Sequence, residues 1–127
     1  MISVIVCGGR DFSGDKFLYS ILDRIHKQQH IATIIHGDAR GADTFAGVWA
    51  RKNNVLEYAE PADWDKYGKS AGYKRNAAMA DLKPHMVIAF SGGRGTQMMV
   101  NIANERSIKV MDFRGLERFL EHDYEGT

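Results

Sequence analysis

The fold of this 127-residue chain is constrained most by five short apolar runs, which are separated by segments whose apolar residues are spaced differently. The runs are Ile2 to Val6, Ile31 to Ile35, Val55 to Ala59, Met86 to Phe90 and Ile108 to Met111. Short β-branched runs favour buried strands, whereas apolar residues three or four apart favour helices. Alternation of the two patterns predicts a parallel sheet with helices on both faces. We expect an α/β, Rossmann-like, doubly wound and mainly parallel five-stranded sheet.

The helical spacing is clearest where apolar side chains form a single stripe. Helices are predicted over residues 17–25, 42–50, 75–82 and 98–103, with a closing helix around 116–120 and a frayed acidic tail over 121–127. The segment from Pro61 to Lys74 is polar and aromatic and follows neither pattern. Helix 75–82 should end before Pro84, because the residue before proline resists the α conformation.

Size and composition bound the classes of function. A chain of 127 residues is long enough for one domain and too short for two, so residues 1–127 are expected to form a single domain. The net charge of +1 gives no support to a nucleic-acid or membrane partner. A single cysteine, Cys7, and the lack of a secretory signal predict a cytoplasmic protein with a reduced, inert thiol. No residues have metal-ligand spacing, so neither a metal site nor a cofactor is expected.

Three glycine-containing loops follow predicted strands, and each carries an arginine. The candidate residues are Gly8, Gly9, Arg10 and Asp11 in the first loop, Gly37, Asp38, Arg40, Gly41 and Asp43 in the second, and Gly92, Gly93, Arg94, Gly95 and Thr96 in the third. The carboxyl ends of parallel strands open at one edge of the sheet, so the three loops are expected to meet. Glycines, a helix N-terminus and guanidinium groups together suit a phosphate.

Two common phosphate-binding motifs are excluded by the same residues. Gly8-Gly9 lacks the third glycine of G-x-G-x-x-G, and no Gly-Lys-Ser/Thr of a Walker A loop occurs. Ordinary NAD-dependent dehydrogenases and P-loop phosphotransferases are therefore disfavoured.

Five ordered motifs resemble the YspA/cpYpsA-related branch of the SLOG superfamily. They are Gly8 to Phe12, His36 to Asp43, Ala62 to Trp64, Gly68 to Asn76 and Phe90 to Thr96. The superfamily also contains the DNA-processing protein DprA and the "Lonely guy" phosphoribohydrolases. The resemblance implies a Rossmann-like fold that binds nucleotides or nucleotide-derived ligands, and it adds Trp64, Arg75 and Asn76 to the candidate ligand-binding residues. Members of this branch are often small bacterial or phage proteins without an assigned reaction.

One departure from that superfamily bears on catalysis. The phosphoribohydrolases carry Pro-Gly-Gly-x-Gly-Thr-x-Glu-Glu, but here Ser91 replaces the proline, and Met98 and Met99 replace the glutamates. A thioether cannot accept a proton, so the same chemistry would need another carboxylate. Asp11, Asp38, Asp43 and Asp63 are the available carboxylates, and Asp43, Asp38 and Asp11 are the preferred candidates. This leaves open whether the protein is an enzyme.

Several of these residues also have purely structural interpretations. Asp43 could cap the helix that follows it, and Asp11 and Asp38 could hold Arg10 and Arg40 in place. His36 is expected to be packed and hydrogen-bonded to a neighbouring loop rather than to act as an acid or base. The aromatic residues Trp64, Tyr67 and Tyr73 could form a wall for a base or simply pack their segment.

Three functions follow from these observations. The preferred one is binding or sensing of a phosphate-containing, nucleotide-derived small molecule, such as an ADP-ribose or nucleoside-phosphate relative. The second is hydrolysis of N-glycosidic or nucleotide bonds with an aspartate in place of the missing glutamate. The third, nucleic-acid handling as in DprA, is disfavoured by the neutral charge. A homodimer or larger homo-oligomer is expected, with no membrane partner.

Overall fold

A single five-stranded sheet forms the centre of the molecule. The structure, a computed structural model, describes residues 1–118. The strands are β1 (Ile2–Cys7), β2 (Ile31–His36), β3 (Leu56–Ala59), β4 (Met86–Ala89) and β5 (Lys109–Asp112). Their order across the sheet is β3-β2-β1-β4-β5, and every pair is parallel. The expected Rossmann-like fold is thus confirmed, with an all-parallel rather than a mainly parallel sheet.

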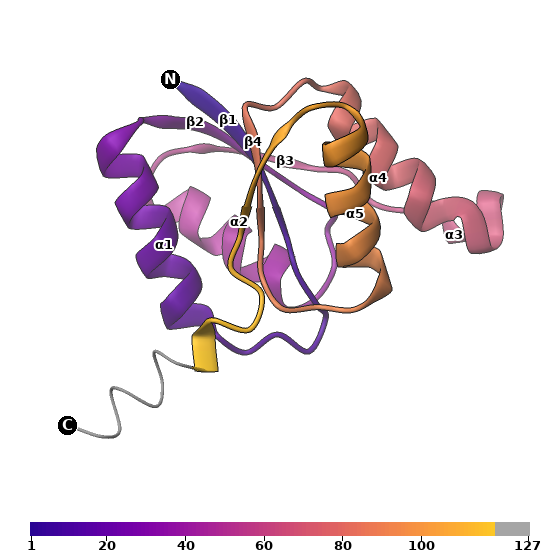
Figure 1. Cartoon of the computed structure of the whole chain (residues 1–127), viewed down its shortest axis with the longest axis horizontal. Helices are drawn as coiled ribbons and strands as arrows, with labels where there is room; N and C mark the ends of the chain where they lie inside the picture. Colours follow the sequence, from indigo (N-terminus) through magenta and orange to yellow (C-terminus); the bar gives the residue numbers. More distant parts are fainter. Residues whose placement is uncertain (119–127) are drawn as a thin grey trace.

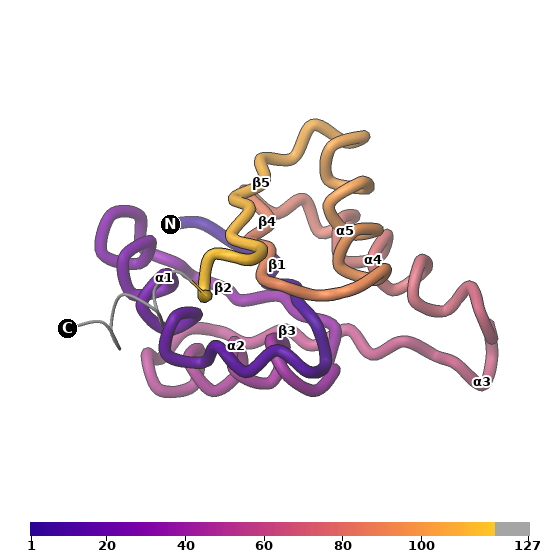
Figure 2. Tube along the Cα trace, turned by 60° about the horizontal axis from the view of Figure 1, so that its bottom comes forward, coloured from indigo at the N-terminus to yellow at the C-terminus, as the bar shows by residue number. Residues whose placement is uncertain are grey.

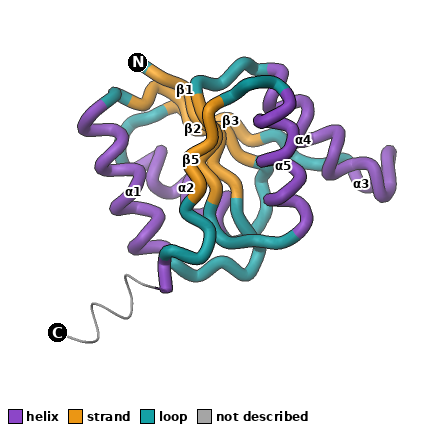
Figure 3. Tube along the Cα trace, in the orientation of Figure 1, coloured by secondary structure: helices purple, strands orange, loops and turns teal. Residues whose placement is uncertain are grey.

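Helices cover both faces of this sheet, as Figures 1 and 3 show. The helices are α1 (Asp15–Gln28), α2 (Ala42–Lys52), α3 (Trp64–Tyr67), α4 (Ala71–Asp81) and α5 (Arg94–Glu105). Helices α1 and α2 pack on one face, whereas α4 and α5 pack on the other. No helix within residues 1–118 is long and apolar enough to cross a membrane.

The side chains of β1 point alternately to the two faces of the sheet, which explains why the core has two layers. Val4 and Val6 pack with α1 and α2, while Ile5 and Cys7 pack with α4 and α5. A strand covered on both faces needs apolar residues at every position, which is why β1 is an almost unbroken apolar run. The chain moves outward from β1 through β2 and β3, then returns to β4 on the other side of β1. The order of the strands therefore reverses between β1 and β4, where α/β folds of this kind place their ligands.

The segment without a clear period folds into helical turns that project from the body of the molecule (Figure 2). Asp63 caps α3 by accepting a hydrogen bond from the N–H of Lys66 at 3.0 Å. A 3₁₀ turn over Gly68–Ser70 then leads into α4, which begins at Ala71. The predicted helix start near Arg75 is therefore wrong by one turn. Polar and aromatic residues on the exposed side of that turn mask its helical period.

Other predicted boundaries shift by one to a few residues. Helix α5 begins at Arg94, so the second half of the third glycine loop is already helical. Strand β3 is an exposed edge strand, which explains its weak pattern. Of the predicted closing helix, Phe119 and Leu120 lie outside the described residues, as does the acidic tail over 121–127.

Candidate functional site

A cavity of about 330 Å³ lies at the carboxyl ends of β1, β2 and β4. We call it the main cavity. Loop residues on its wall are Gly8, Gly9, Arg10, Gly37, Ala39, Asp43, Gly93, Gly95 and Thr96. The remaining wall comes from Val6, Cys7, Trp64, Lys69, Gly72, Tyr73, Arg75, Asn76, Met79 and Met98. The structure therefore brings the three glycine loops and the segment around α4 together at one edge of the sheet.

The loops meet closely enough that two glycines leave no room for a side chain. The N–H of Gly9 donates to the carbonyl of Ser91 at 2.8 Å, which joins the first loop to the third. A Cβ on Gly92 would stand 2.6 Å from the nitrogen of Gly9. Gly41 has a φ of +74°, and a Cβ there would stand 2.2 Å from the carbonyl oxygen of Gly9. These glycines serve the packing of the loops.

Gly93 and Gly95 are glycines for a different reason. A Cβ at either position would meet no protein atom within 4 Å, neither has a positive φ, and both line the main cavity. Gly93 precedes α5 and no side chain caps this helix. The N–H groups of Arg94, Gly95 and Thr96 therefore have no acceptor among the described residues. Bare backbone and free donors at a helix N-terminus suit an anion.

Asp43 is the buried carboxylate of the main cavity. It is only 6% exposed, and its Oδ2 accepts hydrogen bonds from the N–H groups of Gly37 at 3.1 Å and Ala39 at 3.2 Å. Its other oxygen accepts no hydrogen bond from residues 1–118. Burial raises the pKa of Asp43, and the two backbone hydrogen bonds and the charge of Arg75 offset this only in part. Asp43 holds the loop before α2 and does not cap the helix.

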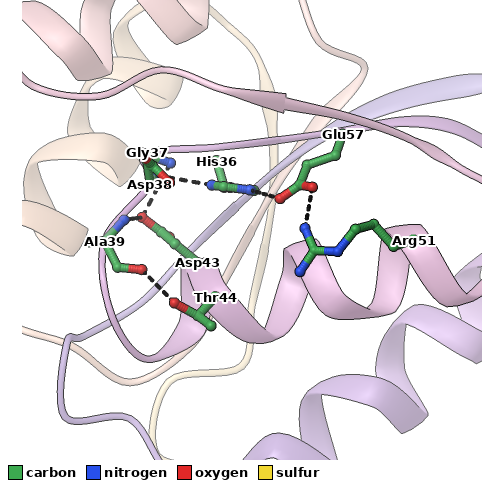
Figure 4. A network of polar contacts seen from close by, with 8 residues as sticks. All are labelled: His36, Gly37, Asp38, Ala39, Asp43, Thr44, Arg51 and Glu57. Atoms are coloured by element: carbon green, nitrogen blue, oxygen red, sulfur yellow. Dashed lines mark hydrogen bonds and ion pairs between the residues drawn. The ribbon is translucent and has the colours of Figure 1, made fainter.

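His36 supports the same loop from behind (Figure 4). Its Nδ1 accepts a hydrogen bond from the N–H of Asp38 at 3.0 Å, so its proton lies on Nε2, 2.7 Å from Oε2 of Glu57. Arg51 donates to the other oxygen of Glu57. The hydrogen bonds from His36 and Arg51 lower the pKa of Glu57, against the effect of burial. The predicted packed and hydrogen-bonded role of His36 is confirmed, but its partners are the loop that directly follows it and Glu57 on β3 rather than a neighbouring loop. Asp38, which donates to His36, has a φ of +59°.

Arg75 and Asn76 tie α4 to two of the glycine loops. Arg75 donates from Nη1 to the carbonyl of Gly37 at 2.7 Å and from Nε to Oδ1 of Asn76 at 2.9 Å. The amide of Asn76 donates to the carbonyl of Gly95 at 3.2 Å. Both residues lie in the second turn of α4 rather than at its start. Asn76 is therefore a bracing residue whose amide already has protein partners, while Nη2 of Arg75 has no partner among the described residues.

The floor and one wall of the main cavity are apolar. Cys7 and Met79 contribute to the floor, and burial raises the pKa of the Cys7 thiol. Met98 stands in the cavity wall, whereas its neighbour Met99 is fully buried in the core. A thioether facing the cavity thus stands where the sequence pattern of the phosphoribohydrolases has its first glutamate. Met79 could not be recognised as a cavity residue beforehand, because it fits an ordinary apolar helix stripe. Met98 fits such a stripe too, but its alignment with a phosphoribohydrolase glutamate is a signal that it faces the site.

The aromatic residues separate into two groups. Trp64 and Tyr73 line the main cavity and are half exposed. Tyr67 lies outside it, with the ammonium groups of Lys66 and Lys74 at 5.1 and 4.9 Å from its ring centroid. Only part of the predicted aromatic wall therefore faces the cavity.

The other candidate residues lie around this cavity. Arg40 and Asp38 line an adjoining hollow, while Asp11 and Gly92 line a third depression beside Glu117. Arg94 is exposed and is not part of the main cavity wall. Within residues 1–118, no group of three or more His, Cys, Asp or Glu side chains is placed to hold a metal ion.

Comparison with known proteins gives the family. The sequence model of the YspA, cpYpsA-related SLOG family matches residues 2–67. The Gene 61 protein of Mycobacterium phage D29 is 33% identical over 121 residues, which cover 89% of this chain and 97% of the phage protein. No solved structure matches the chain. With more than half of the chain matched by the family and almost all of it aligned with a phage relative, this protein belongs to the YspA, cpYpsA-related SLOG family.

Proposed function

We propose that the protein binds a phosphate-containing, nucleotide-derived small molecule in the main cavity. The observation that carries this proposal is the first turn of α5, where Gly93 and Gly95 leave free N–H groups open to the cavity. Protein packing does not require glycine at either position. A phosphate held there would accept hydrogen bonds from the backbone and interact favourably with the helix dipole.

The rest of the cavity suits a nucleoside attached to that phosphate. The floor near Met79 and the faces of Trp64 and Tyr73 offer apolar surface to a base. The free oxygen of Asp43 is an acceptor for a ribose hydroxyl. A volume of about 330 Å³ is within the range of small-molecule sites.

Titration calorimetry with AMP and with adenosine tests the proposal. AMP is expected to bind at least ~10-fold more tightly, since hydrogen bonds to a charged group contribute about 1.5–3 kcal/mol. The two ligands differ only in the phosphate, so the ratio isolates the part assigned to α5. Equal binding of both, or no binding of either, contradicts the proposal.

One observation favours hydrolysis of an N-glycosidic bond as a second candidate function. Asp43 is a buried carboxylate with a raised pKa, one oxygen fixed by the backbone and the other unbonded. In this reaction Asp43 takes a proton from a water molecule as the oxygen of that water bonds to the sugar carbon. The carbon–nitrogen bond breaks, the base leaves with the electron pair and takes up a proton from solvent, and Asp43 returns its own proton to solvent. Met98 cannot serve as that proton acceptor.

Asp43→Asn separates binding, turnover and stability. The amide oxygen can still accept from Gly37 and Ala39, so the fold is retained, while any base release from AMP falls by about 10²-fold or more. The variant is expected to unfold at a higher temperature at neutral pH. The pKa of Asp43 is raised in the folded state, so its ionised form destabilises the native protein when the pH lies above that pKa. When the pH lies below the ordinary value of about 3.9, Asp43 is protonated in both the folded and the unfolded state and this destabilisation is absent. The higher unfolding temperature of Asp43→Asn relative to the wild type should therefore disappear as the pH is lowered.

Asp38→Asn is the matched control for that variant. It removes the same charge from the same loop, but Asp38 is more exposed and lies outside the main cavity. Thermal unfolding from pH 3 to 8 and chromatography of AMP incubations provide the measurements. Equal effects of the two substitutions would show that Asp43 has no special role.

We also propose that the whole chain works as one cytoplasmic domain and forms a homo-oligomer. The sole cysteine is a free thiol, which suits a reducing compartment. The edge strand β3 exposes Leu56 (73%) and Tyr58 (43%), which supports burial of this strand against a second copy.

A further inference from the structure

A second hollow, of about 360 Å³, adjoins the main cavity on the side of β2. Three arginines line it, namely Arg10, Arg40 and Arg75, and we call it the arginine hollow. Arg10 and Arg75 line both spaces, together with Gly37, Ala39 and Trp64. One ligand can therefore extend from the first space into the second.

None of the three arginines has an anionic partner within residues 1–118. Arg10 and Arg40 make no side-chain hydrogen bond or ion pair there. This holds although Asp11 directly follows Arg10 and Asp38 closely precedes Arg40 in the sequence. The expectation that these aspartates hold the arginines is therefore wrong for the described structure. Arg75 donates to two neutral oxygens, those of Gly37 and Asn76. Three guanidinium groups thus share a concave surface with one carboxylate, that of Asp38, and no ion pair joins Asp38 to any of them within residues 1–118.

Arg75 is also fixed before any ligand arrives. Its two hydrogen bonds come from Nη1 and Nε, which leaves Nη2 unpaired among the described residues. Burial lowers the pKa of Arg75, the negative charge of Asp43 opposes this in part, and the positive charge of Arg10 lowers the pKa further. A second anion would relieve this repulsion and would meet donors that lose little side-chain entropy on binding.

We propose that the arginine hollow is a second anion subsite, and that the ligand carries two adjacent anionic groups, as a nucleoside diphosphate does. This presupposes the nucleotide site proposed above. One phosphate lies at the N-terminus of α5, and the next lies between Arg10, Arg75 and Arg40. Arg40 lines the arginine hollow but not the main cavity, so it distinguishes the two subsites.

The test compares AMP and ADP by titration calorimetry with the wild-type chain and with Arg40→Gln. Wild type is expected to bind ADP about 10-fold or more tightly than AMP, because the second phosphate adds charge-assisted hydrogen bonds. In Arg40→Gln most of that advantage is lost, while AMP affinity stays within about twofold. Arg24→Gln on the exposed side of α1 removes the same charge elsewhere and should retain the advantage.

The outcomes separate the two proposals. AMP binding without any advantage of ADP overturns the second subsite and leaves the proposed function intact. An equal loss of AMP and ADP affinity in Arg40→Gln also overturns it, because the hollow would then belong to a single phosphate site. Failure of the wild type to bind either nucleotide overturns both.

Discussion

Gly41→Ala should be among the most destabilising single substitutions in this protein, with a loss of roughly 3 kcal/mol or more. Gly41 has a φ of +74° and a ψ of −124°, a conformation that an L-residue adopts only with strain. The added Cβ would also stand 2.2 Å from the carbonyl oxygen of Gly9 and 2.7 Å from that of Arg10. The first and second loops would have to separate, which would disturb the main cavity as well as the fold.

Gly68→Ala isolates the backbone contribution. Gly68 has nearly the same conformation, with a φ of +56° and a ψ of −130°, but a Cβ there would meet nothing within 4 Å. Gly68→Ala should therefore lower the free energy of unfolding only by the backbone strain, about 1–3 kcal/mol. Urea unfolding followed by the fluorescence of the buried Trp49 measures both variants. Similar losses in the two would show that the contact between the loops contributes nothing, and a Gly41→Ala chain without an unfolding transition would show that it is indispensable.

The fold could be predicted because its signals are local. The buried strand β1 is a short apolar run, and the covering helix α1 has a complete apolar stripe. The loops that form the site could be predicted for a related reason, since the parallel order places the ends of β1, β2 and β4 at one edge. Element boundaries are harder to predict where the pattern is weak: the first turn of α4 is mostly exposed and carries no apolar stripe.

The individual contacts in the site depend on geometry that no local pattern records. Adjacent residues on a helix point about 100° apart, so Met98 lines the cavity while Met99 is in the core, and only the true start of α5 sets this phase. The same phase leaves Arg94 outside the cavity wall. His36 and Glu57 are 21 residues apart and meet only because β2 and β3 pair. Long-range partners of this kind become visible only in the folded structure.

Gly95→Ala is expected to stabilise the protein and to abolish most of its affinity for AMP. Gly95 is the second residue of α5, where alanine favours the helix by up to about 1 kcal/mol relative to glycine. A Cβ there would meet no protein atom within 4 Å, so the fold loses nothing. The methyl group would project into open space at the edge of the main cavity and would keep a phosphate away from the free N–H groups, at a cost of about 10-fold or more in affinity.

Gly92→Ala is the matched comparison, three residues earlier. Its Cβ would stand 2.2 Å from Oγ1 of Thr96 and 2.6 Å from the nitrogen of Gly9, so this variant should lose stability, unlike Gly95→Ala. Thermal unfolding and calorimetry with AMP on both variants give two independent readings. Unchanged AMP affinity in Gly95→Ala would mean that the first turn of α5 is not the phosphate site. A gain in stability together with a loss of binding would mean that this glycine is required by a ligand, because nothing in the folded chain itself requires it.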